Sequence, residues 1–320
     1  MARYIVNRIL VSIPVFFGIT LIVFALFALS PGDPVINIIG FANYTEMTSE
    51  QVEAVRIQFG LDQPWPIRYI RWLGDALQGD LGFPFKGSMS VTELLGERIG
   101  PTLLLMGSSF LTSLLIGIPM GVIMGLKQYS FTDYTLTVLA FFNLSIPSFF
   151  LALGSIYIFA LKLNLLPTNG MQTIGAPFSL TDRLLHLILP TMVLGSFYSG
   201  VWARYARSSI LEVLGQDYIR TARAKGLLEW TVIARHAFRN ALLPLVTVVT
   251  LSLPQLLGGA IIVETIFQWP GMGMLGWRAT TTRDYPILMG VTLISATMIL
   301  LSNLLADVLY GLVDPRIRYD

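Results

Sequence analysis

Apolar residues gather in six long runs along the chain, and the segments between the runs hold most of the charged residues. A helix of about 20 apolar residues crosses the roughly 30 Å hydrocarbon core of a bilayer. Each run reaches or approaches that length. The pattern therefore predicts an all-α integral membrane protein with six transmembrane helices. The runs cover residues 9–29, 102–126, 134–161, 185–203, 241–265 and 286–312.

The first run follows Arg3 and Arg8, as the apolar region of a secretory signal peptide also would. It is longer than the apolar region of such a peptide, and Ser30-Pro31-Gly32 is a poor cleavage site. We therefore expect an uncleaved first transmembrane helix.

The composition supports a membrane protein and narrows its chemistry. Of the 320 residues, 54% are hydrophobic and only 12% are charged, whereas about 25% of a soluble domain is charged. The absence of cysteine excludes disulfides, thiolate catalysis and cysteine-based metal sites. The two histidines, His186 and His236, lie too far apart in the sequence to suggest a metal site. We expect no metal and no cofactor in this chain.

The distribution of Lys and Arg predicts the orientation. With the N-terminus inside, the short inside segments hold 12 of the 21 basic residues, at more than twice the density of the outside segments. By the positive-inside rule, both termini are then cytoplasmic. We expect one transmembrane domain, residues 1–320, with a long extracytoplasmic segment at 30–100 and a cytoplasmic loop at 204–240. A helix is predicted near residues 49–59, with Ser49 as its N-cap.

The cytoplasmic loop contains a short predicted helix with defined ends. Asp217 suits the N-cap position, Arg223 and Lys225 fall in the last turn, and Gly226 suits a left-handed C′ position. Two turns of helix are marginal alone in water, so tertiary contacts should hold it as a rigid knob. A basic amphipathic segment on anionic lipid and a dock for a cytoplasmic protein both fit these residues. The small residues, including Ala222 and Ala224, favour the close approach of a protein.

A second helix is predicted directly after this knob. One apolar face recurs at helical spacing, while Arg235 and Arg239 lie elsewhere on the helix, one turn apart. The residues of the apolar face are Trp230, Ile233, Ala234, Ala237, Phe238, Ala241 and Leu242.

The same loop resembles the cytoplasmic coupling loop of bacterial ABC importer permeases. The general pattern there is Glu-Ala-Ala, three residues, Gly and a later Leu-Pro. Here Arg220-Thr221-Ala222, Gly226 and Leu243-Pro244 stand at these places. Arg in place of Glu, and a proline that comes about five residues later, are similar to the dipeptide, oligopeptide and nickel branch.

Further segments resemble that branch in order and spacing over nearly the whole chain, and the long segment after the first helix is similar to the B-type, or first, permease subunit. These segments are Pro31-Gly32-Asp33-Pro34, Ser145-Ile146-Pro147-Ser148-Phe149, Leu166-Pro167-Thr168-Asn169-Gly170, residues 263–273 and Leu312-Val313-Asp314-Pro315-Arg316.

The resemblance implies a type I ABC importer permease fold and a non-catalytic role in peptide import. The implied partners are a C-type permease subunit forming a heterodimer, two cytoplasmic ATPases, an extracytoplasmic solute-binding protein and membrane lipid, with no nucleic acid. ATP and Mg would be bound by the ATPases, since the chain has no Gly-x-x-x-x-Gly-Lys-Ser/Thr loop. The implied location is a bacterial or archaeal cytoplasmic (inner) membrane. Import of a nickel complex or of glutathione is the alternative.

Other classes of function fit the sequence less well. An ion-coupled secondary transporter would need ionisable residues at mid-membrane and often has internal repeats, and we find neither. No His-Glu-x-x-His motif or plausible Ser/His pair suggests a membrane enzyme. A receptor or scaffold would not need the capped basic helix.

The resemblance also assigns candidate site residues. Candidates for coupling to the ATPases are Asp217, Tyr218, Arg220, Thr221, Ala222, Arg223, Ala224, Lys225 and Gly226. Candidates for the pathway are Ser252, Gln255, Gly258, Gly259, Asn143 and Ser145, although close helix packing explains the glycines equally well. Candidates for an outer loop that contacts the binding protein or the dimer interface are Trp269, Pro270 and Gly271, which a buried turn packed on its own chain would also explain.

Overall fold

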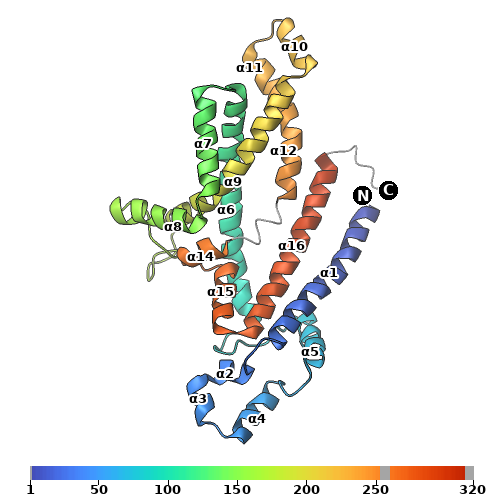
Figure 1. The fold of residues 1–320 in the computed structure, drawn as a ribbon, viewed down its shortest axis with the longest axis vertical. Helices are drawn as coiled ribbons and strands as arrows, with labels where there is room; N and C mark the ends of the chain where they lie inside the picture. The colour runs from blue at the N-terminus through green and yellow to red at the C-terminus, as the bar shows by residue number, and fades with distance from the viewer. Residues whose placement is uncertain (1, 253–259, 314–320) are drawn as a thin grey trace. The chain divides into compact units, whose positions relative to one another are not determined.

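The computed structural model describes residues 2–252 and 260–313, which form helices joined by turns and loops (Figure 1). The chain divides into two units. The first contains residues 103–269 and the chain from 302 onward, and the second contains residues 2–102 and 270–301. Helices α6 and α16 contribute to both units, and each unit is described by itself.

The second unit holds the first apolar helix and the long segment after it. Its helices are α1 (Ala2–Ala28), α2 (Pro34–Ile39), α3 (Phe41–Glu46), α4 (Ser49–Gln58), α5 (Trp65–Leu77), the start of α6 (Val91–Leu126), α15 (Met272–Thr282) and most of α16 (Tyr285–Val313). The expected helix near 49–59 is therefore present as α4. The predicted N-cap Ser49 is wrong by one residue, because Thr48 caps the helix in a reciprocal capping box with Gln51.

Helix α5 packs on α1 through aromatic side chains. The ring of Tyr69 lies edge-on to Phe24 at a centroid distance of 5.5 Å, and Trp72 lies 6.1 Å from Phe24. The buried hydroxyl groups of Tyr69 and Thr20 are 3.0 Å apart, which gives both polar atoms a partner. These contacts fix one face of α5 against the first apolar helix.

The first unit is built around α9, which packs against α7, α8 and α12. Its elements are the rest of α6, α7 (Phe131–Ser145), α8 (Ser148–Ser155), the π-helical turn η1 (Ile156–Lys162), α9 (Leu180–Leu214), α10 (Asp217–Ala224), α11 (Glu229–Thr231), the π-helical turn η2 (Val232–Phe238), α12 (Arg239–Leu251) and α14 (Ile261–Ile266). The hydroxyl of Ser209 donates to the carbonyl of Ala241 at 2.9 Å, which joins α9 to α12.

Three glycines bring the backbones of α6 and α9 into direct contact. Gly117, Gly121 and Gly125 recur every four residues on one face of α6. A Cβ at Gly117 would lie 2.5 Å from the carbonyl oxygen of Ser199. A Cβ at Gly121 would collide with the carbonyl of Ala203, and one at Gly125 with the side chain of Ile210. This is the small-residue packing that lets membrane helices approach closely.

Five described helices are long and apolar enough to cross a membrane, and a bent helix pair makes a sixth if it counts as one span. The predicted runs 9–29, 102–126, 185–203 and 286–312 each fall within a long helix or overlap one extensively. The predicted single helix at 134–161 is wrong. Its two halves, α7 and the α8–η1 segment, meet at an angle of 102° at Ile146-Pro147 (Figure 1).

The predicted single helix at 241–265 is also wrong in its extent. The span that contains its first half begins earlier, at Glu229, and ends at Leu251. Residues 253–259 lie outside the described part of the chain, and the short helix α14 then begins at Ile261. Pro244 lies inside α12 and does not end the helix.

Candidate functional site

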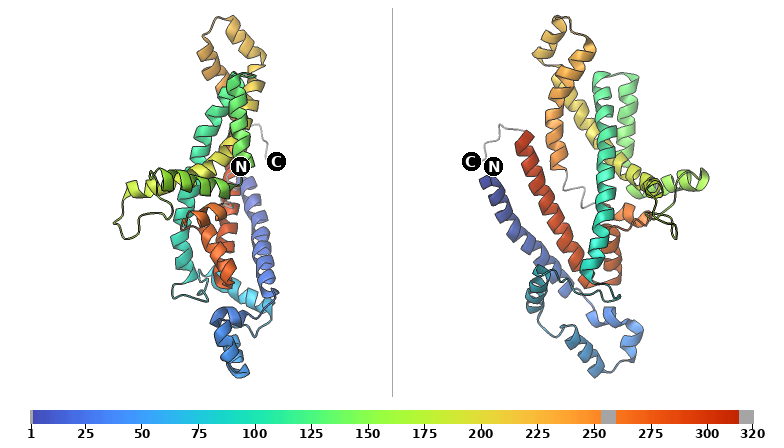
Figure 2. Two further views of the ribbon diagram at one scale, coloured as in Figure 1. Left: turned by 60° about the vertical axis from the view of Figure 1, so that its left-hand side comes forward. Right: turned by 180° about the vertical axis from the view of Figure 1, so that it is seen from behind.

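The candidate coupling residues form a protruding tip of the first unit. Helix α10 follows α9 and precedes α11, and both short helices lie beyond the ends of α6 and α7 in every view (Figures 1 and 2). The tip is therefore accessible to a partner while it remains attached to two long helices, α9 and α12.

The start of α10 differs from the prediction. Gln216 is the N-cap residue and makes no side-chain capping bond, whereas Asp217 is the first helical residue. The predicted N-cap Asp217 is thus wrong by one position. Its carboxylate lies in the first turn, where the helix dipole favours an anion, and it pairs with Arg220 at 3.3 Å. Both side chains are exposed, so this pair contributes little to stability.

The end of α10 matches the prediction at Gly226. This residue has φ of 74°, the left-handed conformation that glycine adopts without strain. The amide of Gly226 donates to the carbonyl of Arg223 at 2.9 Å, and the amide of Leu227 donates to that of Ala222 at 3.4 Å. The two bonds form a Schellman motif, which satisfies carbonyls that the helix end leaves free.

The inner face of α10 is packed into its own chain. Ile219 is 0% exposed and Ala222 is buried, and both join a core with Ile210 of α9 and Val232 of η2. The helix is therefore held by tertiary contacts, as its short length requires. The expectation that Ala222 opens the surface to a partner is wrong, because its methyl group faces this core. Ala224 remains exposed.

An ion pair closes the loop between α10 and α11. The guanidinium group of Arg223 donates from Nη2 and Nε to the two carboxylate oxygens of Glu229, at 2.6 and 3.1 Å. The hydrogen bonds to Glu229 raise the pKa of Arg223 above its usual value. This partner could not be predicted from the sequence, since the six-residue separation fits no helical spacing and spans the turn at Gly226. Arg220 and Lys225 are the other exposed cations of the tip.

Large apolar side chains stand on the outer surface of the tip. Trp230 is 77% exposed and Leu228 is 78% exposed, and Tyr218 is also exposed. The sequence places Trp230 on the apolar face of the second helix, and this placement is wrong because the side chain does not pack with the rest of that face. The segment contains the π-helical turn η2, whose i to i+5 bonds shift the register, so Val232 is buried outside the predicted face. Ala237 and Ala241 of the predicted face are buried as expected.

A buried ion pair fixes α7 to α9 below the tip. Arg207 donates from Nε and Nη2 to the two carboxylate oxygens of Asp133, at 3.0 and 2.9 Å. The Asp133 side chain is 3% exposed, and it also accepts a bond from the amide of Tyr129 at 3.0 Å. Hydropathy alone does not predict this pair, although Asp133 directly precedes an apolar run and Arg207 follows one.

The predicted pathway residues are only partly described. Ser252 is the C-cap residue of α12 and donates to the carbonyl of Val248 at 2.8 Å. Asn143 is half-buried, and Ser145 is exposed and donates to the carbonyl of Phe141. Ser145 also lines a cavity of about 280 Å³ at the bend between α7 and α8. Gln255, Gly258 and Gly259 lie outside the described residues.

The predicted contact of the Trp269 turn with a binding protein is wrong for its central side chain. Trp269 is 0% exposed and belongs to the core of the first unit, together with Val263 and Phe267. Its amide donates to the carbonyl of Glu264 at 2.8 Å. The alternative, a turn packed on its own chain, is confirmed. Pro270 is half-buried and Gly271 is buried.

Comparisons with known proteins agree with this arrangement. Residues 117–319 match the family described as binding-protein-dependent transport system inner membrane component, and residues 1–103 match the N-terminal part of such components. A solved chain of the MetNI methionine ABC transporter, in inward-facing conformations, superimposes with a TM-score of 0.55 at 18% identity. That likeness covers 71% of this chain and all of the solved one, and it shows the all-helical fold of a type I ABC importer permease.

Curated relatives cover the whole chain. The oligopeptide transport system permease protein AppB of Bacillus subtilis is 42% identical over 100% of both chains. The dipeptide transport system permease protein DppB of Escherichia coli is 40% identical over 100% of this chain and 99% of its own length. DppB of Alkalihalophilus pseudofirmus is 37% identical over 100% of both. With its packed α10 helix and its apolar spans, this chain belongs to the family of inner membrane components of binding-protein-dependent transport systems.

Proposed function

We propose that this chain is a non-catalytic membrane subunit of an ATP-driven importer for di- or oligopeptides. Family membership and the names of the relatives support transport across the inner membrane, with peptides as the substrate class. The subunit would form half of the translocation pathway and pair with a second, C-type permease. Two cytoplasmic ATPases would bind ATP and Mg, and a solute-binding protein would deliver the peptide from outside.

The observation that carries the coupling role is the construction of the α10 tip. Its inner face is fixed by Ile219 and Ala222, while Tyr218, Leu228 and Trp230 project outward. Large aromatic and apolar side chains around a rigid centre are typical of protein interfaces. Of the three exposed cations of the tip, Arg223 is engaged by Glu229, which weakens the attraction of the tip to anionic lipid.

The proposed mechanism is a two-state change that the ATPases drive. Closure of the ATPase pair would carry α10 with it. Because α10 packs on the end of α9 and on η2, the displacement would pass into α9 and α12 together. Both helices would then change their tilt, and the pathway would reorient between the two sides of the membrane.

Reconstitution tests this function. The chain is placed in vesicles with its C-type partner and the ATPases, and the binding protein and a labelled dipeptide are supplied on the outer side. We expect uptake that requires ATP, the binding protein and the ATPases together. Parallel measurements with a longer peptide, a nickel complex and glutathione assign the substrate class. ATP-independent uptake driven by an ion gradient would overturn the proposal.

A further inference from the structure

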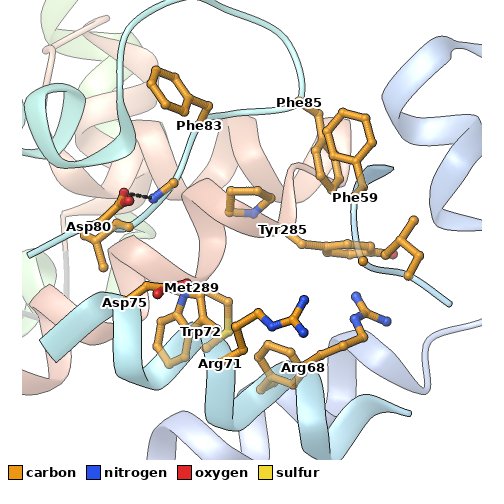
Figure 3. Close-up of a pocket in the computed structure, with 16 residues that line it drawn as sticks. Phe59, Arg68, Arg71, Trp72, Asp75, Asp80, Phe83, Phe85, Tyr285 and Met289 are labelled. Carbon is orange, nitrogen blue, oxygen red and sulfur yellow. Dashed lines mark hydrogen bonds between the residues drawn. The ribbon is translucent and has the colours of Figure 1, made fainter. Parts of the chain in front are cut away.

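A cavity of about 280 Å³ lies within the second unit, apart from the α10 tip. Residues of α1, α5, the loop before α6 and the start of α16 line it (Figure 3). Its walls are largely aromatic, with Phe24, Trp72, Phe85 and Tyr285 among the lining residues. Nothing in the proposed coupling mechanism uses this cavity.

Three hydrogen-bond donors of the cavity lack acceptors among the described residues. Arg68 is half-buried and Arg71 exposed, and neither forms an ion pair or a hydrogen bond with another residue that the structure describes. The indole Nε1 of Trp72 is buried without a partner. Arg68 instead lies over the ring of Phe24, 5.9 Å from its centroid. A buried N–H without an acceptor is costly, so the site favours a ligand that brings one.

The charge of the cavity is balanced rather than purely basic. Figure 3 shows the guanidinium groups of Arg68 and Arg71 close together, and the carboxylates of Asp75 and Asp80 on the other side of the cavity. Asp80 accepts a bond from the amide of Gly82 at 2.8 Å. Burial lowers the pKa of Arg68 below its usual value. A ligand with an anionic and a cationic end matches this arrangement.

The cavity lies near the end of the apolar helix α1. Phe24 is one helical turn, or about 6 Å, before the end of the apolar helix α1 at Ala28. Helix α5 is strongly amphipathic, and its apolar residues Ile67, Ile70 and Leu77 are exposed although the other face packs on α1. Such a helix lies in the membrane interface with its apolar side toward the acyl chains. With α1 spanning the bilayer, the residues that line the cavity near the end of α1 come to the level of the phospholipid phosphates.

We propose that this cavity binds the headgroup of an amine-bearing phospholipid such as phosphatidylethanolamine. The phosphate accepts hydrogen bonds from the guanidinium groups of Arg68 and Arg71 and from the indole N–H of Trp72. The primary ammonium lies toward Asp75. The acyl chains run along the exposed apolar surfaces of α1 and α5. The bound lipid thus fixes α5 to the membrane surface where α1 ends.

Native mass spectrometry of the full-length chain in detergent tests the site. The chain is titrated with phosphatidylethanolamine, phosphatidylcholine and phosphatidylglycerol of identical acyl chains. We expect the tightest binding for phosphatidylethanolamine, because the quaternary ammonium of phosphatidylcholine has no N–H and phosphatidylglycerol has no cation. Arg68→Gln and Arg71→Gln should each weaken that binding about tenfold, and Trp72→Phe should weaken it less.

Two further variants keep the test independent of folding. Arg183→Gln is the matched control, since Arg183 also lies over a phenylalanine ring, at 4.7 Å from Phe178, but does not line the cavity. Its lipid affinity should equal that of the unmodified chain. Asp75→Asn should reduce the preference for phosphatidylethanolamine over phosphatidylglycerol. A misfolded chain would lose affinity for every lipid equally and would not show this selective change.

Equal affinity for the three lipids, or unchanged binding in both arginine variants, would overturn the proposal. Displacement of the lipid by a free dipeptide, but not by phosphoethanolamine, would also overturn it and assign the cavity to a peptide. These outcomes are separate from those of the uptake assay, because lipid binding is measured on the isolated chain without ATP.

Discussion

Gly226 is a residue whose backbone conformation, rather than its surroundings, restricts substitution. Its φ is 74°, yet a Cβ placed there would meet nothing within 4 Å. A β-branched residue would therefore strain or unwind the end of α10, at a cost of about 1–2 kcal/mol, without any collision. We expect Gly226→Val to separate ATP hydrolysis from transport, which paired measurements of peptide uptake and stimulated ATPase activity would detect.

Gly226→Asn is the matched control for this prediction. Asparagine tolerates the left-handed conformation better than other residues with a side chain, so it should retain most of the uptake. If Gly226→Val left both uptake and stimulated ATPase activity unchanged, α10 would not be the coupling element. Equal loss in both variants would point instead to a direct contact at this position.

The buried ion pair of Asp133 and Arg207 gives a second prediction at this scale. Removal of one partner leaves an uncompensated charge, so Arg207→Met should lower the free energy of unfolding by about 3 kcal/mol. The double variant Asp133→Asn with Arg207→Met should recover much of this loss, since no charge is then left without its partner. Thermal unfolding in detergent measures both. An unaltered melting temperature in the single variant would show that the pair is not important for stability.

Single residues differ in how well the sequence alone predicts them. Gly226 was predicted because few residues other than glycine adopt its conformation, so the residue type carries the information. The N-caps were wrong by one position at both Asp217 and Ser49, since Gln216 and Thr48 precede them and adjacent polar residues compete for the cap. Trp230 was misplaced because a π-helical turn changes the period on which the prediction rests.

The contact between α6 and α9 is a feature of whole helices. Because Gly117, Gly121 and Gly125 leave no room for a Cβ, Gly121→Val must push the helices apart or deform them. Overpacking of this kind costs about 1–3 kcal/mol. We expect a lower melting temperature in detergent for Gly121→Val. Gly107→Val is the control on the same helix, since a Cβ at Gly107 meets nothing within 4 Å, and its melting temperature should be nearly unchanged.

The effect of a proline on a helix explains why the sequence predicts the apolar spans better than the points at which a span bends. Pro14, Pro190 and Pro244 all lie inside long helices, whereas Pro147 stands at the 102° bend between α7 and α8. A proline disfavours helix at the residue before it, but neighbouring helices in a membrane can satisfy the freed backbone groups. The difference arises from tertiary contacts, which a hydropathy pattern does not contain.

At the scale of the molecule, the proposed orientation can be tested with introduced cysteines. The chain has no cysteine of its own, so a single one gives a signal without background. Glu50 and Lys225 are both exposed. We expect a membrane-impermeant maleimide to label Glu50→Cys in spheroplasts. Lys225→Cys should react only after the membrane is permeabilised. Labelling of both from the same side would contradict the predicted topology.

The family and the helix at residues 217–226 with its glycine end could be predicted from the sequence, because they depend on local patterns. The Asp133–Arg207 pair and the Arg68 cavity could not, since each joins segments far apart in the chain. The burial of Trp269 could not be predicted from its local motif either. Its motif marked an outer loop, but only the fold reveals that the side chain fills a core rather than a partner's surface.

The glycine contact between α6 and α9 has a mechanical consequence. Side chains between two helices normally act as a compliant layer, because they change rotamer while the axes shift. At Gly117, Gly121 and Gly125 no side chains separate the two backbones, so α6 and α9 should move as one rigid body. Helix α10 is joined to α9 by a short turn. A displacement of α10 should therefore move α6 together with α9, although α10 follows α9 in the chain and not α6.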